Sequence, residues 1–134
     1  KSSNLKGVEI ESEQIPKMID EFPIICVAAS LAEGKTRIKG ASELRFKESD
    51  RIKTMSKELR KLGGNVKEFD DGVEITGVEK FKGGTCNSHG DHRVAMSLLV
   101  AGLNAKEETI VEDTDCIDTS FPGFMDVLNS LRDE

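Results

Sequence analysis

The chain has 134 residues, of which 37% are hydrophobic and 33% charged, and its formal net charge is −6. This size and balance are typical of one globular domain with a single core. An acidic chain argues against a general nucleic-acid role, and no apolar run approaches the roughly 20 residues of a membrane helix. We therefore predict a cytoplasmic protein that binds neither nucleic acid nor membrane. Because the chain starts at Lys1 rather than Met, we expect it to be processed or a piece of a longer chain.

The first elements predicted along the chain are a strand at Val8–Ile10 and a buried helix. Residues from Ile15 to Leu31 are apolar on nearly every side, as in a helix that is covered all round. Pro23 is tolerated only in the first turn of a helix, so the helix should start near Asp20. A second strand is predicted at Thr36–Lys39, where apolar and polar residues alternate.

An amphipathic helix and a hairpin follow. The apolar positions at steps of 3, 4 and 3 that predict the helix are Ile52, Met55, Leu59 and Leu62. Gly63 and Gly64 should end this helix. Strands at Val66–Phe69 and Val73–Thr76, joined by a short turn with glycine, predict a β-hairpin.

The same order of elements then recurs about 70 residues later. Asp91 precedes a second helix that is apolar all round, Thr109–Val111 is a strand, and a second apolar stripe follows at Phe121, Phe124, Leu128 and Leu131. The chain therefore holds one full βαβαββ unit at about residues 8–77 and a partial unit at 78–134 without its last two strands. This alternation predicts an α/β (α+β) fold with some parallel strand pairs, and the incomplete repeat favours a fragment.

Charged residues crowd the start of the Ile52 helix in "KESDR" (47–51). Ser49 could be the N-cap, and acids beside it suit the positive end of the helix dipole. However, Lys47 and Arg51 oppose the dipole, and cations beside free backbone N–H groups make an anion site. From the spacing alone, the cap and the anion site both remain open.

Two further helix starts carry charges. Asp91 should cap the second buried helix, yet His92 and Arg93 in its first turn would suit a phosphate or carboxylate ligand. Asp20, taken alone, is best explained as an N-cap. If the two units pack side by side, these helix starts can face one cleft, and carboxylates among anion-binding cations then suggest proton transfer. Ser120 with Pro122 is explained by a helix cap alone.

Four segments together resemble 5-enolpyruvylshikimate-3-phosphate synthases. They are "KESDR" (47–51), "GDHRVAM" (90–96), "IDEFP" (19–23) and "SFPGF" (120–124), and "ELRKLGG" (58–64) also fits. The resemblance spans essentially the whole chain and corresponds to the C-terminal third of such an enzyme. It implies a lobe of βαβαββ units in an inside-out barrel, whose last unit is completed by strands from the chain's N-terminus.

The resemblance also implies a reaction and roles for single residues. The enolpyruvyl group of phosphoenolpyruvate would move to the 5-hydroxyl of shikimate 3-phosphate, in the biosynthesis of aromatic amino acids, without a metal or other cofactor. Asp20 would accept the hydroxyl proton and contact shikimate 3-phosphate, and Glu48 would protonate the methylene carbon. Lys47 would bind the shikimate substrate. The residues implied for phosphoenolpyruvate are Arg51, His92 and Arg93.

Some members of the family carry a lysine where this chain has Thr119, which puts one phosphoenolpyruvate contact in doubt. We expect the chain alone to be inactive because the other, N-terminal lobe would supply essential contacts. Two alternatives remain: an enolpyruvyl transferase acting on UDP-N-acetylglucosamine, and a non-catalytic anion-binding module.

Overall fold

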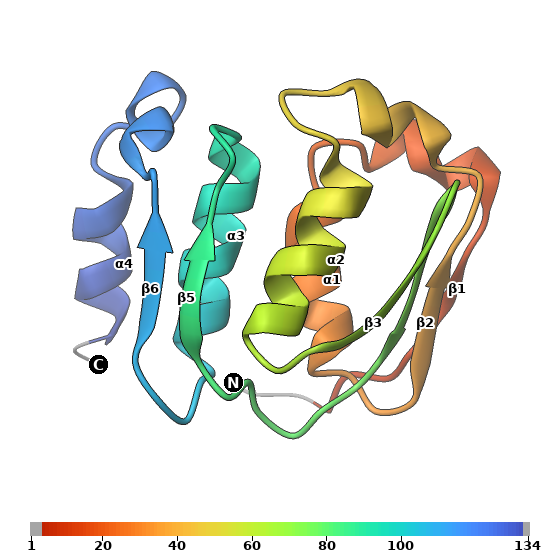
Figure 1. Ribbon diagram of the computed structural model, residues 1–134, viewed down its shortest axis with the longest axis horizontal. Helices are drawn as coiled ribbons and strands as arrows, with labels where there is room; N and C mark the ends of the chain where they lie inside the picture. The colour runs from red at the N-terminus through yellow and green to blue at the C-terminus, as the bar shows by residue number, and fades with distance from the viewer. Residues whose placement is uncertain (1–3, 133–134) are drawn as a thin grey trace.

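Helices form the middle of the molecule in the computed structural model, which describes residues 4–132 (Figure 1). The strands are β1 (Glu9–Ile10), β2 (Lys35–Ile38), β3 (Asn65–Phe69), β4 (Gly72–Thr76), β5 (Gly84–Asn87) and β6 (Thr109–Glu112). The α-helices are α1 (Phe22–Ser30), α2 (Arg51–Lys61), α3 (His92–Gly102) and α4 (Phe124–Arg132). Three short 3-10 helices are η1 (Ser12–Lys17), η2 (Ser42–Phe46) and η3 (Asp115–Thr119).

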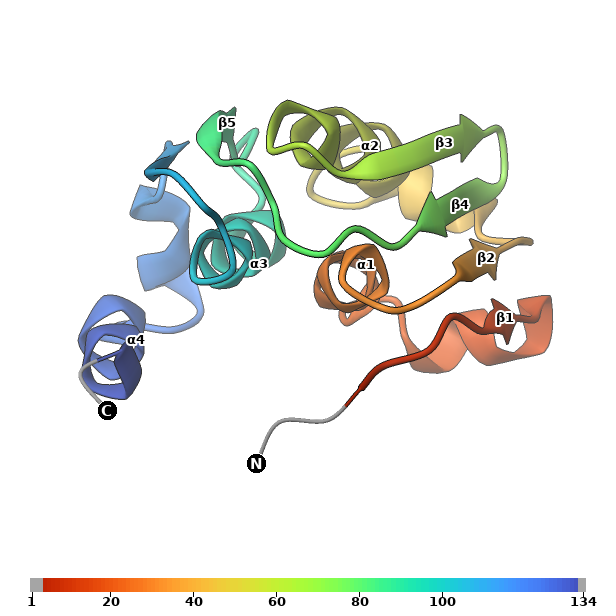
Figure 2. The same ribbon diagram turned by 90° about the horizontal axis from the view of Figure 1, so that it is seen from below.

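Two sheets lie on opposite sides of the packed helices α1, α2 and α3 (Figures 1 and 2). The larger sheet has the order β1-β2-β4-β3, in which β1 pairs parallel with β2 while β4 is antiparallel to both neighbours. The smaller sheet is the parallel pair β5 and β6. The predicted α/β class with parallel pairs is confirmed, and so is the hairpin of β3 and β4.

The apolar stripe of α2 forms the centre of the core. Its four members, Ile52, Met55, Leu59 and Leu62, are all 0% exposed. Gly63 follows with a φ of +95°, a left-handed conformation that glycine adopts without strain, so the predicted helix end is confirmed. The stripe packs α2 against β3 and β4 and thereby fixes where the start of α2 lies.

Helix α1 starts near Asp20 with Pro23 in its first turn, as predicted, but its cap differs from the prediction. The helix begins at Phe22 with Pro23 in its first turn, and its N-cap position is Glu21, whose side chain makes no cap hydrogen bond. Asp20 is therefore not the cap. The preceding residues Ser12–Lys17 form η1, because Pro16 within them does not suit a continuous α-helix. Ile24 is 38% exposed, so α1 is not covered on every side.

The last helix also differs from the prediction. It begins at Phe124, and Phe121 lies outside it. Ser120 ends η3 instead of capping α4. Of the predicted stripe, Leu128 is buried but Leu131 is 62% exposed, because no described strand covers this face of α4.

All four α-helices begin at the same end of the molecule, at the top of Figure 1. The turns that precede them consequently gather at that end. None of the helices in residues 4–132 is long and apolar enough to cross a membrane.

Candidate functional site

The residues that the sequence singles out lie at or just before three helix starts. Asp20 precedes α1, Lys47 and Glu48 connect η2 to α2, Arg51 opens α2, and His92 and Arg93 open α3. These helices begin at one end of the molecule (Figure 1). At that end Asp20 and Glu48 both contact the guanidinium group of Arg51, and Arg93 contacts Asp20.

Arg51 is the centre of this cluster, and its side chain is only 1% exposed. Its Nε donates to Asp91 Oδ2 at 2.9 Å, and Nη2 donates to Glu48 Oε2 at 2.7 Å and to Asp91 Oδ1 at 3.4 Å. Nη1 donates to the Ile19 carbonyl at 3.2 Å and to Asp20 Oδ1 at 3.4 Å. These five contacts match the five N–H donors of a guanidinium group, so Arg51 has no donor left over.

The three carboxylates around Arg51 differ sharply in exposure. The side chain of Asp91 is 0% exposed, whereas those of Asp20 and Glu48 are 57% and 53% exposed. Burial alone would lower the pKa of Arg51. The hydrogen bond and charge of Asp91, the charge of Glu48 and the hydrogen bond to Asp20 outweigh burial and raise the pKa above its ordinary value. Asp91 is thus a fixed partner, while Asp20 and Glu48 can leave Arg51 for water.

Asp91 has two structural tasks, which confirms the predicted cap and adds to it. It accepts hydrogen bonds from the backbone N–H groups of Arg93 at 3.0 Å and Val94 at 3.4 Å, and so caps α3. Its Oδ2 also accepts a hydrogen bond from the Ser49 hydroxyl at 2.8 Å. Burial would raise the pKa of Asp91, but the hydrogen bonds from Arg51 and Ser49 and the charge of Arg51 outweigh it and lower the pKa.

The cap of α2 was predicted wrongly. Asp50, rather than Ser49, caps the helix by accepting from the Lys53 N–H at 3.0 Å. Both residue types are good caps, so local preference could not separate them. The contact of Ser49 with Asp91 joins residues 42 positions apart in the sequence, and only the packing of α2 beside α3 reveals it.

Arg93, which contacts Asp20, is a cation of this cluster with a spare donor. Arg93 Nη2 lies 3.7 Å from Asp20 Oδ2, and its buried Nε has no hydrogen-bond partner among the described residues. Lys47 is exposed. Because a buried guanidinium N–H without an acceptor is unfavourable, Arg93 is suited to take an incoming anion.

His92 is held by a residue that the sequence assigned to a helix cap. Its Nδ1 is hydrogen-bonded to the Ser120 hydroxyl, which follows η3. Ser49, Ser120 and Asp91 are therefore the site residues that sequence reasoning missed or explained by caps alone. Their patterns are those of ordinary caps, and no local signal distinguishes the two uses.

One group of side chains has the residue types of a metal site. Ligand atoms of Glu48, Asp91 and His92 lie within 4.8 Å of one another. However, Asp91 already accepts from Arg51, Ser49 and the start of α3. The charge of Arg51 would also repel a cation, so the arrangement favours an anion over a metal ion.

Comparison with known proteins settles the family. The model of the family described as EPSP synthase (3-phosphoshikimate 1-carboxyvinyltransferase) matches residues 1–128. The chain belongs to the EPSP synthase family. Its relatives named 3-phosphoshikimate 1-carboxyvinyltransferase include one from Geotalea daltonii, 56% identical over 131 residues, and one from Desulforudis audaxviator, 53% identical over 132 residues. Each alignment covers 98% of this chain, and the chain spans about 30% of the relatives' length.

Solved EPSP synthase structures agree with this assignment. One from Acinetobacter baumannii superposes with a TM-score of 0.90 at 41% sequence identity, and a second gives 0.87 at 37%. Both comparisons cover 95% of this chain and 30% of the solved chain. The fold is therefore that of part of an EPSP synthase.

Proposed function

We propose that this chain provides part of the C-terminal lobe, and one wall of the active site, of a 3-phosphoshikimate 1-carboxyvinyltransferase. The enzyme would transfer the enolpyruvyl group of phosphoenolpyruvate to the 5-hydroxyl of shikimate 3-phosphate and release phosphate. One observation carries the proposal: Arg51 holds Asp20 at 3.4 Å and Glu48 at 2.7 Å, with Arg93 on the far side of Asp20. The two acids Asp20 and Glu48, one for each proton transfer, thus lie beside Arg51 and Arg93, which would bind an anionic substrate.

The proposed reaction has an addition step and an elimination step. The 5-hydroxyl oxygen attacks carbon 2 of phosphoenolpyruvate and gives its proton to Asp20, while Glu48 donates a proton to the methylene carbon. The product of this addition is a tetrahedral ketal. In the second step the newly formed methyl group returns a proton to the Glu48 carboxylate, the carbon–oxygen bond to phosphate breaks, and phosphate leaves with the bonding electrons.

Substrate binding requires an exchange at Arg51. All its donors are engaged, so a direct contact with phosphoenolpyruvate needs Glu48 or Asp20 to move aside. Both carboxylates are more than half exposed and can do so at little cost, whereas buried Asp91 would stay in place. Arg93, with its unpartnered Nε, would receive the anion first and His92 would lie beside it, while Lys47 would bind shikimate 3-phosphate.

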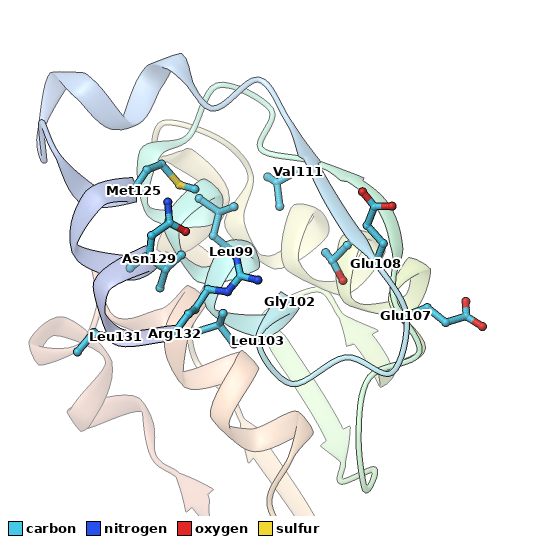
Figure 3. Close-up of a pocket in the computed structure, with 12 residues that line it drawn as sticks. Leu99, Gly102, Leu103, Glu107, Glu108, Val111, Met125, Asn129, Leu131 and Arg132 are labelled. Atoms are coloured by element: carbon cyan, nitrogen blue, oxygen red, sulfur yellow. The ribbon is translucent and has the colours of Figure 1, made fainter. Parts of the chain in front are cut away.

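The rest of the enzyme would complete the second unit. A groove of about 740 Å³ runs between α3, β6 and α4 and is lined by apolar side chains such as Leu99, Val111 and Met125 (Figure 3). In the first unit β4 pairs with the edge of β2, and α2 covers β3 and β4. By the same geometry, the exposed face of α4 and the edge of β6 that pairs with no described strand would take an antiparallel hairpin. The N-terminal part of the parent enzyme would supply its strands.

A chimaeric enzyme tests the activity. This chain would replace the matching segment of the Geotalea daltonii relative, and phosphate release would be measured with phosphoenolpyruvate and shikimate 3-phosphate. We expect turnover with this pair and none with UDP-N-acetylglucosamine as acceptor. The chain alone should release no phosphate. Turnover only with the nucleotide sugar would support the alternative transferase, and binding of both substrates without turnover would support an anion-binding module.

Glu48→Gln tests the assignment of the acid within the same chimaera. The amide keeps the size of the side chain but cannot protonate carbon, so turnover should fall by about 10²–10⁴-fold with substrate binding retained. Glu43→Gln is the matched control, because Glu43 is an exposed acid of the neighbouring η2. Equal effects of the two substitutions would contradict a chemical role for Glu48.

A further inference from the structure

A second buried carboxylate on α2 lies outside the cluster described above. Glu58 is 0% exposed and follows Arg51 by seven residues. Seven residues are close to two helical turns, so both side chains leave the same face of α2. That face is turned toward β5 and α3. A buried carboxylate is unfavourable unless its contacts compensate, so the position of Glu58 calls for an explanation.

The contacts of Glu58 are made with the turn that joins β5 to α3. Its Oε1 accepts the Asn87 N–H at 2.6 Å, and Lys61 Nζ lies 3.0 Å from the same oxygen. Its Oε2 has no hydrogen bond within the described part of the chain and lies 3.7 Å from His89 Nε2. Lys61 is 40% exposed. A pair between Glu58 and Lys61 could form equally well at the surface, so it does not explain why the carboxylate of Glu58 is buried.

The turn itself is tightly determined from Asn87 onward. The Asn87 side chain accepts the His89 N–H at 2.7 Å, and the Ser88 hydroxyl accepts the Gly90 N–H at 3.1 Å. His89 has a φ of +55° and Gly90 of +75°. For a histidine this left-handed conformation is unfavourable, and it persists only where surrounding contacts impose it. The turn ends at Asp91, which pairs with Arg51.

We propose that Glu58 is a positioning residue for the candidate site. Helix α2 holds the turn at both ends, through Glu58 and Asn87 at its start and through Arg51 and Asp91 at its end. The spacing of Arg51 and Glu58 along one rigid helix thereby sets where Asp91, His92 and Arg93 lie relative to Glu48. The proposal rests on the proposed function only for the effect on turnover, because the geometry of the turn is measured separately.

Two substitutions separate positioning from stability. Glu58→Met removes the acceptor for the Asn87 N–H at similar volume, while Glu58→Gln keeps an oxygen that can accept it. Leu59→Ala is the control, since Leu59 is equally buried on the same helix and packs in the core instead of against the turn. The first readout is the NMR signal and hydrogen exchange of the Arg51 Nε–H group in this chain and in the chimaera. The second is kcat/KM of the chimaera.

In Glu58→Met we expect a shifted, faster-exchanging Arg51 Nε–H signal and a kcat/KM lower by about 10- to 100-fold, since small displacements of positioned groups have effects of this size. In Glu58→Gln the Arg51 Nε–H signal and kcat/KM should both stay close to those of the unmodified chimaera. Leu59→Ala should lower the midpoint of denaturation but change neither readout. The proposal is overturned if Glu58→Met behaves like Leu59→Ala, with lost stability but an unchanged Arg51 signal. If the unmodified chimaera has no activity while the Arg51 signal responds as expected, the proposed function fails and the positioning role stands.

Discussion

The buried pair of Arg51 and Asp91 allows the sharpest quantitative prediction. Replacing Asp91 by alanine leaves the guanidinium group, which is 1% exposed, without its fully buried carboxylate partner. The same change removes the cap of α3 and the acceptor of the Ser49 hydroxyl. We expect Asp91→Ala to be among the most destabilising single substitutions in the molecule.

The size of the effect follows from these contacts. Removing one partner of a buried ion pair costs about 3–5 kcal/mol. Without Asp91, the guanidinium of Arg51 keeps as counter-charges only Glu48 and Asp20, whose side chains are more than half exposed. Loss of an N-cap side chain accounts for about 1 kcal/mol of this. For a domain of this size the change corresponds to a melting temperature lower by roughly 10–15 °C.

Asp50→Ala is the matched control, since Asp50 also caps a helix through one backbone N–H. Its pair with Arg45, at 3.0 Å, is partly exposed and contributes little, so the total should be about 1–2 kcal/mol. Urea denaturation of both variants gives the comparison. If Asp91→Ala is no more destabilising than Asp50→Ala, the buried ion pair does not stabilise the fold and the reasoning is wrong.

Three further predictions concern acid, thiols and one glycine. The pKa of Asp91 is lowered in the folded state, so its ionised form stabilises the fold fully above its ordinary pKa of about 4, and this stabilisation is lost as the pH falls through the lowered pKa. The difference in free energy of unfolding between the unmodified chain and Asp91→Asn, measured by urea denaturation, should therefore be constant above pH ~4 and shrink at lower pH. Burial raises the pKa of the Cys26 thiol, and burial together with the charge of Glu58 raises the pKa of Cys86 to about 11. Iodoacetamide should therefore label the half-exposed Cys116 first, as mass spectrometry would show. A Cβ at Gly72 would lie 1.7 Å from the Ile38 carbonyl oxygen, so Gly72→Ala should separate β4 from β2 and cost at least about 2 kcal/mol. Gly102→Ala, whose Cβ would lie 3.1 Å from Thr109 Cβ and needs a smaller shift, should lower the free energy of unfolding less, as urea denaturation of both variants would show.

Elements governed by local patterns could be predicted from the sequence. The stripe of α2, the hairpin of β3 and β4, the cap of α3 at Asp91 and the end of α2 at Gly63 all follow from rules that act within a few residues. The elements that differ depend on distant partners or on irregular backbone. Residues 12–17 wind as a 3-10 helix around Pro16, and α4 starts later than its apolar spacing indicates.

The same distinction holds for the site. The sequence identified the charged residues near the helix starts, but not which of them would be buried. Nothing in the spacing of Arg51 or Glu58 distinguishes them from the exposed charges of α2, and a pair such as Glu58 and Lys61 is typical of a solvated helix face. Burial is decided by α3 and β5, which follow later in the chain and pack against α2.

The different contacts of two aspartates give a physical reason for the different roles proposed for them. Asp20 and Asp91 precede the corresponding helices α1 and α3, and both contact Arg51. Asp91 caps its helix and is buried, so its proton affinity and its position are tied to the stability of the fold. Asp20 makes no cap, because α1 begins two residues later with Pro23 in its first turn. Asp20 is 57% exposed and caps no helix, so in the proposed function it would rotate to meet the hydroxyl and take its proton while Arg51 stays in place.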